Sequence, residues 1–257
     1  MISSIANPKI KLVRALQAKR SARQAERLFV VEGVRLVEEA ARAPQPPQLA
    51  LHVADQDARG QAALDELRAR GTAVECVTAA VMAAASGTET PPGLLAVAPL
   101  PALTPSLPLT LALALDGLRD PGNLGTILRT ADAAGVDAVF LAPGTVDPFN
   151  PKVVRAAMGA HFHLPILPAG WEALAERLAG LAVWLAEAGE GTLYPQVDWR
   201  RPSALIIGSE AAGPGEAARR LAPRRVCIPM PGQAESLNAA VAAGILIFEA
   251  VRQRQGR

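Results

Sequence analysis

Residues 109–142 constrain the fold of this chain more than any other stretch, because they read as a strand, a loop and a helix in succession. An apolar run that alternates Leu with Ala ends at Asp116, and a turn rich in Gly, Pro and Asp follows it. An amphipathic segment opens near Asn123, and Arg129 lies about one and a half turns further on. A helix start offers unpaired backbone N–H groups and a partial positive charge, which suit a phosphate or a carboxylate. The loop is therefore predicted to form the rim of an active site.

The basic residues gather at the start of the chain. The net charge is only +2, but residues 1–42 hold nine Lys or Arg and four Glu, which gives +5 for this segment and −3 for the rest. A basic arm on a nearly neutral body is typical of a protein that binds nucleic acid, although a solvated helical face has the same composition. The candidates for RNA contact are Lys9, Lys11, Arg14, Lys19, Arg20, Arg23 and, later in the chain, Arg155.

Residues 1–98 are predicted to form a compact α/β domain of their own. A basic helix follows Asn7 and Pro8, and strand and helix segments then alternate. The strands are expected at 28–33, 49–54, 73–78 and 93–98, with helices at 34–41, 58–70 and 79–85. Four prolines punctuate residues 99–108, which favours an extended, semi-rigid linker and places the domain boundary there.

Residues 109–257 are predicted to form a second α/β domain. After the opening strand, further strands are expected at 137–141, 181–187, 204–208 and 226–229, with helices from Asn150, at 171–178, at 215–221 and at 237–252. The last helix is apolar on nearly all its faces, which is more apolar surface than one sheet needs to cover it. Part of this helix is therefore predicted to be a dimer interface.

The composition argues against a membrane protein and against a metal or disulfide scaffold. No apolar stretch reaches the roughly 20 residues that span a bilayer, and the first residues lack the apolar segment of a signal peptide, so we expect a cytoplasmic protein. Cys76 and Cys227 lie far apart and are expected to be buried thiols. A strand would place His161 and His163 on one face, but without acidic or Cys neighbours a structural or RNA-facing role is favoured over a metal.

Three polar clusters follow predicted strands of the second domain, at residues 116–129, 208–213 and 230–238. Ligands of open α/β sheets bind beyond the carboxyl ends of the strands, so these clusters can converge on one site. In the second cluster Glu210 lies between two glycines, which permit close backbone approach, and in the third Ser236 and Asn238 stand at a helix start. Taken singly, each cluster is explained as well by a turn or a helix cap.

Taken together, the clusters resemble a known family. The order DPGNLGTILR, IIGSEAAG and IPMPGQAESLNAAVAAGI resembles the three motifs of the SPOUT methyltransferases, in the SpoU or TrmH branch of RNA ribose 2′-O-methyltransferases. The segment PKVVRAAMGAHFHLP is also similar to this family, and residues 7–40 resemble the L30e-like substrate-binding domain that precedes the catalytic domain in many members. The resemblance implies S-adenosylmethionine as cofactor, a deep C-terminal trefoil knot, which few proteins have, and a homodimer formed through the catalytic domain.

The resemblance also implies roles for individual residues. The catalytic residues would be Asn123, Arg129, Glu210, Ser236 and Asn238, and the cofactor would contact Gly208, Ile228, Met230 and Leu237. Arg129 is often proposed as the base in this family, but a guanidinium group with a pKa above about 12 is a poor base. We expect Arg129 to hold an RNA phosphate and to stabilise the developing alkoxide. The other four catalytic residues are expected to orient the ribose and the loops, with Glu210 fixing Asn123 or the loop.

The expected substrate is RNA of the 23S ribosomal type, with transfer RNA as the alternative. Two other interpretations remain open at this stage. The basic arm alone would also serve a non-catalytic RNA-binding protein. Residues 213–218 match the GxGxxA pattern of dinucleotide-binding enzymes, although they come late in the chain and several residues after the nearest predicted strand.

Overall fold

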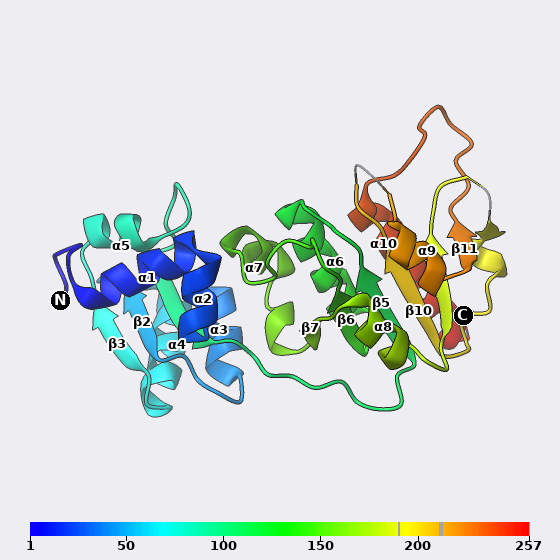
Figure 1. Ribbon diagram of the computed structural model, residues 1–257. Helices are drawn as coiled ribbons and strands as arrows, with labels where there is room; N and C mark the ends of the chain where they lie inside the picture. Colours follow the sequence, from blue (N-terminus) through cyan, green and yellow to red (C-terminus); the bar gives the residue numbers. More distant parts are fainter. Residues whose placement is uncertain (190, 211–212, 257) are drawn as a thin grey trace. The chain divides into compact units, whose positions relative to one another are not determined.

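The structure is a computed structural model that describes residues 1–189, 191–210 and 213–256 (Figure 1). It divides into two compact units, each built from helices and a β-sheet, which confirms the predicted α/β class. The first unit comprises Met1–Ala102 and Phe149–Phe162, and the second comprises Leu103–Pro148 and His163–Arg257. Within the described ranges, every helix is too short or too polar to cross a lipid bilayer.

The first unit is organised around a mixed sheet with the strand order β1-β4-β2-β3. Its strands are β1 (Leu28–Glu32), β2 (Leu49–His52), β3 (Ala73–Cys76) and β4 (Leu94–Pro99). Strand β4 runs antiparallel to β1 and β2, whereas β2 and β3 are parallel. Each of these strands lies at a position that the alternation of strand and helix segments predicts.

Helices cover both faces of this sheet. They are α1 (Pro8–Ala18), α2 (Arg20–Glu26), α3 (Val34–Arg42), α4 (Ala58–Ala69) and α5 (Ala79–Ala85). Because successive strand residues point to opposite faces, Phe29 and Val31 share a core with α3 and α4, while Leu28 and Val30 share a core with α1 and α5. The basic segment forms two helices rather than one, since Lys19 adopts an extended conformation between α1 and α2.

The segment between the first two motifs packs on the first unit, although it lies in the middle of the predicted second domain. It contains α7 (Pro151–Ala157) and a 3₁₀ helix, η1 (Ala160–Phe162). The ring of Phe29 on β1 lies 5.1 Å from that of Phe149 and 5.8 Å from that of Phe162, between ring centroids. These aromatic contacts explain why the segment belongs to the first unit.

The second unit is organised around a sheet with the strand order β7-β6-β5-β10-β8-β11-β9, in which every neighbouring pair is parallel. Its strands are β5 (Leu111–Leu115), β6 (Ala138–Leu141), β7 (Ile166–Pro168), β8 (Ala182–Ala186), β9 (Thr192–Leu193), β10 (Ser203–Ile207) and β11 (Arg224–Cys227). The short strands β7 and β9 were not predicted. Strand β10 lies between β5 and β8, so strands distant in sequence end side by side.

Helices of the second unit pack on its sheet and on one another. They are α6 (Pro121–Ala133), α8 (Trp171–Arg177), α9 (Glu216–Leu221), α10 (Ala239–Arg254) and the 3₁₀ helix η2 (Tyr194–Gln196). Helices α8 and α9 share a core with Ala112 and Ala114 of β5, whereas α6 and α10 pack against each other. The contact between α6 and α10 brings the first and third sequence motifs together.

Candidate active site

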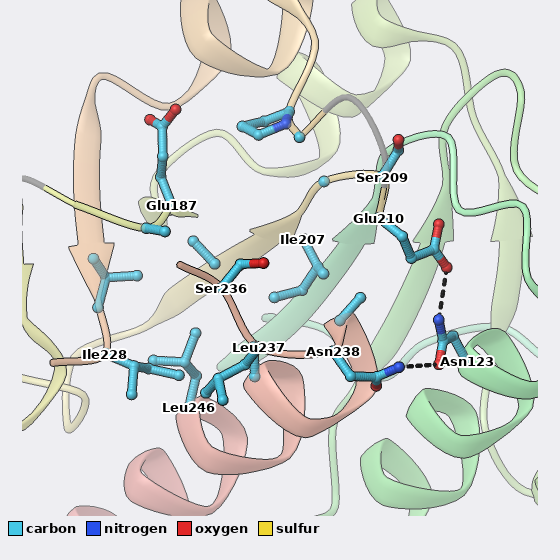
Figure 2. A pocket seen from close by; sticks show the side chains of 18 of the residues that line it. Asn123, Glu187, Ile207, Ser209, Glu210, Ile228, Ser236, Leu237, Asn238 and Leu246 are labelled. Carbon is cyan, nitrogen blue, oxygen red and sulfur yellow. Dashed lines mark hydrogen bonds between the residues drawn. The ribbon is translucent and has the colours of Figure 1, made fainter. Parts of the chain in front are cut away.

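A cavity of about 940 Å³ lies where parallel strands of the second unit end (Figure 2). Its lining includes residues that come after four neighbouring strands: Glu187, Gly208 and Ile228 directly follow β8, β10 and β11, and Arg119 and Asp120 lie in the loop between β5 and α6. The carboxyl ends of parallel strands meet at one edge of the sheet, which is where α/β proteins bind their ligands. The prediction that the three motifs converge is therefore confirmed.

A chain of hydrogen bonds joins one side chain from each motif (Figure 2). Asn238 Nδ2 donates to Asn123 Oδ1 at 2.9 Å, and Asn123 Nδ2 donates to Glu210 Oε1, also at 2.9 Å. The second carboxylate oxygen of Glu210 accepts from the backbone N–H of Arg119 at 3.4 Å. An ionised carboxylate only accepts hydrogen bonds, so Glu210 fixes which way the amide of Asn123 points, and that amide in turn fixes Asn238.

Helix α6 begins earlier than the sequence indicates. Its first residue is Pro121, and Asp120 is the N-cap, whose Oδ1 accepts from the N–H of Asn123 at 2.7 Å. The expectation that the helix opens near Asn123 with free N–H groups was therefore wrong in this detail, because a carboxylate already occupies that end. The consequence is that Asn123 is rigidly placed within the first helical turn.

Helix α10 places the third motif. Asn238 is its N-cap, and its Oδ1 accepts from the N–H groups of Ala240 and Val241 at 2.9 and 3.3 Å. The same side chain therefore caps α10 with its oxygen and binds Asn123 with its nitrogen. Ser236 lines the cavity, and the N-cap of α10 is Asn238 rather than Ser236.

The remaining wall of the cavity is largely apolar, and it includes all four residues predicted to contact the cofactor. These are Gly208, Ile228, Met230 and Leu237, joined by Ile207 and Leu246. A Cβ atom on Gly208 would lie 2.4 Å from the backbone nitrogen of Pro214, a distance that no side chain tolerates. Glycine at this position therefore lets the loop at 213–215 approach the end of β10, and Asp116 holds that loop by accepting from the N–H of Gly215 at 2.7 Å.

Four charged residues that the sequence analysis did not single out also line the cavity, namely Arg119, Asp120, Glu187 and Arg219. Glu187 forms ion pairs with Arg219 Nη2 at 2.5 Å and with Arg225 Nε at 2.9 Å. Arg119 is exposed at the rim, next to the hydrogen-bonded chain. Glu187 directly follows β8, so applying the strand-end rule to that strand would have found it, whereas Arg119 lies within the first predicted cluster.

Arg129 is not part of this cavity. It is exposed on α6, six residues after Asn123. Six residues at about 100° each turn a side chain by roughly 240°, so Arg129 points to a different side of the helix. The structure thus brings together Asn123, Glu210, Ser236 and Asn238 but leaves Arg129 outside the site of its own chain.

The residues predicted to contact RNA fall into three groups in the first unit. Lys9, Lys11, Arg14, Lys19 and Arg20 are exposed or half-buried on α1 and α2. Lys9 forms an ion pair with Glu75, and its hydrogen bond lowers the pKa of that carboxyl group. Arg23 is 4% exposed, and its Nη1 donates to the backbone oxygens of Leu16 and Gln17 at 2.5 and 3.4 Å. Its prediction as an RNA contact is therefore wrong, because its guanidinium group joins α2 to the end of α1.

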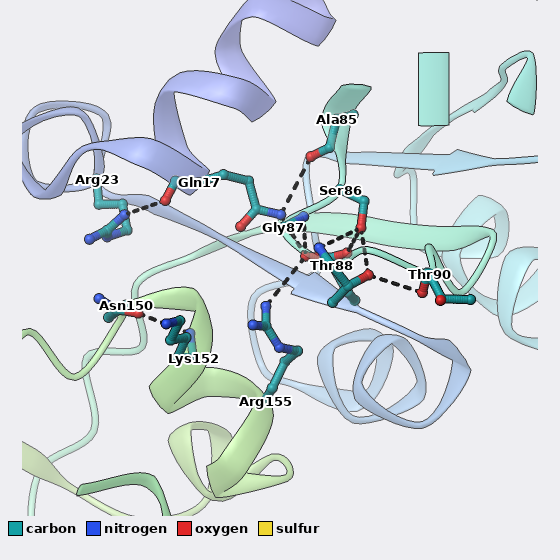
Figure 3. Close-up of polar contacts among 11 residues, drawn as sticks. Gln17, Arg23, Ala85, Ser86, Gly87, Thr88, Thr90, Asn150, Lys152 and Arg155 are labelled. Carbon is teal, nitrogen blue, oxygen red and sulfur yellow. Dashed lines mark hydrogen bonds and ion pairs between the residues drawn. The ribbon is translucent and has the colours of Figure 1, made fainter. Parts of the chain in front are cut away.

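Arg155 extends from α7 toward a buried carboxylate rather than into open solvent (Figure 3). Its Nη1 lies 3.9 Å from Glu32 Oε1. The Glu32 carboxylate also accepts from Gln17 Nε2 at 2.7 Å, from the N–H of Gly87 at 2.9 Å and from the hydroxyl of Ser86. Arg155 thus belongs to a network within the first unit, and contact with RNA phosphate is not its evident role.

His161 and His163 do not share a strand face. His161 lies in the 3₁₀ helix η1, buried with its ring 6.0 Å from that of Phe29 and 5.4 Å from that of Phe149. His163 is exposed in the second unit, with Nδ1 at 3.5 Å from Asp132 Oδ2. A strand, which would have placed both rings on one face, is not formed here, and the burial of His161 among aromatic rings fits the structural role that the sequence favours. The expectation of two buried thiols is wrong in part, since Cys227 is buried but Cys76 is only half-buried.

Two family profiles together match most of the chain. Residues 110–248 match the SpoU rRNA Methylase family, and residues 7–96 match the MRM3-like substrate binding domain. A similar protein is the 23S rRNA (guanosine(2553)-2′-O)-methyltransferase RlmP of Bacillus subtilis, which is 36% identical over 251 residues that cover 96% of this chain and 97% of the relative. The 23S rRNA (uridine(2479)-2′-O)-methyltransferase of Streptomyces viridochromogenes is 33% identical over 261 residues, covering 96% and 91%.

Solved structures agree with these sequence matches. The SpoU methyltransferase AviRb from Streptomyces viridochromogenes, in complex with the cofactor AdoMet, superposes with a TM-score of 0.87 at 30% identity, covering 97% of this chain and 98% of that one. An AdoMet-bound rRNA methyltransferase from Sinorhizobium meliloti superposes with a TM-score of 0.84 at 34% identity, covering 98% and 97%.

Proposed function

This chain belongs to the SpoU rRNA Methylase family, and we propose that it transfers a methyl group from S-adenosylmethionine to a ribose 2′-hydroxyl of 23S ribosomal RNA. The proposal rests on the series of hydrogen bonds from Asn238 to Asn123 and from Asn123 to Glu210. These bonds fix two side-chain amides beside a largely apolar cavity. Ribosomal RNA as substrate implies a reaction in the cytoplasm. The family match leaves no support for a dinucleotide-binding enzyme.

The cavity fits the cofactor in size and in chemistry. Small-molecule sites are commonly about 300–1,000 Å³ and are mostly apolar, with a few placed polar groups, and the cavity of about 940 Å³ has this character. Ile228, Met230 and Leu237 would hold the adenine, and the paired Glu187 and Arg219 offer opposite charges to its ammonium and carboxylate groups. When bound, S-adenosylmethionine supplies a methyl group attached to a positively charged sulfur.

The polar side chains are suited to orienting the ribose. In methyl transfer the 2′-oxygen must lie in line with the methyl carbon, so positioning supplies a large share of the rate. Asn123, Asn238 and the hydroxyl of Ser236 would bind the sugar, while Glu210, whose oxygens already accept from Asn123 and from the backbone, acts as a positioning residue. The ribose oxygen would gain the methyl group and lose its proton to water, while the bond between the methyl carbon and the sulfur breaks and its electron pair stays on the sulfur as a neutral thioether.

Arginines would hold the RNA phosphates around the cavity. Arg119 is placed to do so within its own chain, because it is exposed at the rim. Arg129 lies outside that rim and would act at the cavity of a second copy of the chain, where it stabilises the developing alkoxide. Further phosphates would bind the exposed cations of α1 and α2, which are Lys9, Lys11, Arg14, Lys19 and Arg20.

A homodimer through α10 follows from the same scheme. Val241 is 52% exposed and Phe248 is 48% exposed on this otherwise well-packed helix. Large exposed apolar side chains on one element favour burial against a partner, and α10 packs beside α6, which carries Arg129. We also propose that the chain from β10 to α10 forms the trefoil knot that the family resemblance implies. The position of β10 between β5 and β8 supports such a path.

The direct test is methyl transfer to defined RNA. Purified protein is incubated with S-adenosylmethionine carrying a tritiated methyl group and with 23S, 16S or transfer RNA from a strain that lacks the gene. We expect label at one nucleotide of 23S RNA, in a 2′-O-methylated ribose identified by mass spectrometry. Tritium in transfer RNA alone would show that transfer RNA, and not 23S RNA, is the substrate. A tritiated methyl group on a base would overturn the proposed reaction.

A further inference from the structure

A second cavity lies entirely within the first unit, and none of its lining residues has a role in the proposed reaction. Its volume is about 660 Å³, and it forms where the turn after β1, the turn after β2 and the residues before β4 meet α7. Part of its wall is apolar, formed by Val34, Val53, Pro91, Pro92 and Met158. The cavity is therefore large enough, and apolar enough on one side, for a flat organic ring.

The polar side of this cavity carries both paired and unpaired charges: Glu32 pairs with Arg155 and Asp57 caps α4, whereas Arg35 and Asp55 differ from them. Arg35 and Asp55 are both exposed at the cavity. Among the described residues, neither side chain forms a hydrogen bond or an ion pair. The hydrogen bond from Arg59 lowers the pKa of Glu38, and the positive charge of Arg35 lowers it slightly further without direct contact. Arg155 Nη1 lies 3.9 Å from Glu32 Oε1, which is too long for a hydrogen bond.

The mixture of charges excludes simple ions as the natural ligand. The carboxylates of Glu32, Asp55 and Asp57 would repel a phosphate, and the guanidinium groups of Arg35 and Arg155 would repel a cation. A well-matched ligand is neutral and presents hydrogen-bond donors on one edge and acceptors on another. A nucleobase has these properties, and its flat faces suit the apolar wall.

We infer that this cavity binds an unpaired guanine base of the RNA substrate. Guanine presents O6 and N7 as paired acceptors, which match the fork of an arginine such as Arg35. Its N1–H and N2–H₂ groups are neighbouring donors, which match the two oxygens of a carboxylate such as Asp55. Residues 7–96 match a substrate binding domain, which is consistent with an RNA contact in this unit. The inference rests on the proposed function only for the source of the guanine.

The test uses the full-length protein and short fluorescent RNAs. Three nine-residue oligouridines carry guanosine, inosine or adenosine at the centre, and their dissociation constants are measured by fluorescence anisotropy at one salt concentration. A bidentate contact discriminates between bases by about tenfold or more, so we expect the guanosine oligonucleotide to bind about tenfold more tightly than the adenosine one. Inosine lacks the N2 amino group and is expected to bind with intermediate affinity.

Two variants and two controls assign the preference to this cavity. Arg35→Ala should reduce the preference for guanosine over adenosine to the part that Asp55 supplies, and Asp55→Asn should remove the difference between guanosine and inosine. Arg68→Ala should keep both differences, because Arg68 pairs with Asp65 on α4 and does not line the cavity. Lys11→Ala should weaken all three RNAs equally, as expected of a phosphate contact.

Equal affinity of the wild-type protein for the three RNAs would overturn the inference. It would also be overturned if the affinity ratios between the guanosine RNA and the other two were the same in both cavity variants as in the wild-type protein. The methyl-transfer assay on 23S RNA separates this outcome from the proposed function. Guanosine preference without methyl transfer would overturn only the proposed reaction, and methyl transfer without guanosine preference would overturn only the guanine site.

Discussion

The cavity of the second unit and the cavity of the first unit described above differ in how their polar side chains are paired. In the second unit Asn238, Asn123 and Glu210 bind one another, so their orientations are set before any ligand arrives. In the first unit Arg35 and Asp55 line a cavity, and no side chain in the part of the chain that the structure describes forms a hydrogen bond with either of them. A paired network suits a reaction that depends on alignment, whereas unpaired charges suit recognition of a ligand that brings its own donors and acceptors.

The difference follows from how each cavity is built. Four parallel strands end together in the second unit, and two helix starts add Asn123 and Asn238 at fixed positions. The cavity of the first unit is formed by turns of a mixed sheet and by α7, which reaches it from a distant part of the sequence. From this contrast we expect that substitutions in the hydrogen-bonded network of the second unit lower the rate of reaction. Substitutions of exposed cations should instead weaken the affinity for RNA.

The largest effect is expected from Asn238→Asp. Aspartate caps a helix about as well as asparagine does, so the bonds to the N–H groups of Ala240 and Val241 survive. It has no N–H₂ group, however, and it places a negative charge beside Asn123 and Glu210. We expect the turnover number for methyl transfer to fall by about 100-fold, as is found when a preorganised donor is removed, while the melting temperature stays nearly unchanged.

Asn150→Asp is the matched control for this variant. Asn150 caps α7 by accepting from the N–H of Lys152 at 2.9 Å, and it lines neither cavity. This variant should keep both its stability and its turnover number. Were Asn238→Asp to retain the wild-type rate, the hydrogen-bonded chain would have no role in the reaction.

Arg129→Ala should also lower the turnover number by about 100-fold, but its defect should be complemented by a second chain. If Arg129 serves the cavity of the partner copy, a dimer of one Arg129→Ala chain and one Asn238→Asp chain contains one intact site. Random mixing in equal amounts makes half of the dimers mixed, each with one of two sites intact, so about a quarter of the wild-type activity should return. The activities of the separate variants and of the refolded mixture are compared.

Absence of recovery in the mixture would contradict the assignment of Arg129 to the partner's site, provided that mixed dimers are shown to form by mass spectrometry. It would leave the role of Asn238 untouched, since the unmixed variants test that residue separately.

Arg119→Ala should have a smaller effect, on RNA binding rather than on turnover. Arg119 is exposed at the rim, and the hydrogen bond that joins it to Glu210 comes from its backbone N–H and not from its guanidinium group. We expect the KM for RNA to rise about tenfold with little change in the turnover number, and the slope of log affinity against log salt to fall by about 0.7, the value for one phosphate contact on a single strand.

Arg220→Ala is the control, because Arg220 is exposed, pairs with Glu216 and lies outside the cavity. A drop in turnover with an unchanged salt slope in Arg119→Ala would show that Arg119 belongs to the aligning network and not to RNA recognition.

Local patterns in the sequence were sufficient to predict most helices and strands and the convergence of the three motifs. They did not predict features that depend on contacts between distant residues. Arg23 looks like other residues of the basic arm, and its burial follows from the break at Lys19, which leaves backbone oxygens of α1 for its guanidinium. The start of α6 was misplaced because Asp120 and Asn123 are both good caps, and Pro121 decides between them.

The cavity of the first unit could not be predicted from the sequence either. Its walls come from turns near residues 33, 55 and 92 and from α7. No local pattern indicates that these turns meet, since their association depends on the order of β1, β4 and β2 in the sheet. The packing of residues 149–162 on Phe29 likewise required the three-dimensional structure.

The smallest effect is expected from Glu249→Gln, which tests a charged pair that serves neither cavity. Glu249 on α10 accepts from Arg252 Nε and Nη2, each at 2.8 Å, and from Gln253 Nε2. The hydrogen bond from Arg252, with that from Gln253, lowers the pKa of Glu249. A lowered pKa in the folded state stabilises the protein above the unfolded pKa of about 4.3, and this contribution is lost as the pH falls through the folded value.

Glu249→Gln should therefore lower the free energy of unfolding by less than about 1 kcal/mol at pH 7, with a difference that shrinks toward zero as the pH falls below about 4. Urea unfolding at pH 7 and below pH 4 measures this difference in the free energy of unfolding. Glu216→Gln is the control and should change the stability less, because Glu216 pairs with Arg220 at an exposed position. The turnover number should stay within twofold of wild type for both variants. A large loss of activity in Glu249→Gln would mean that alignment in the second unit extends along α10 well beyond Asn238.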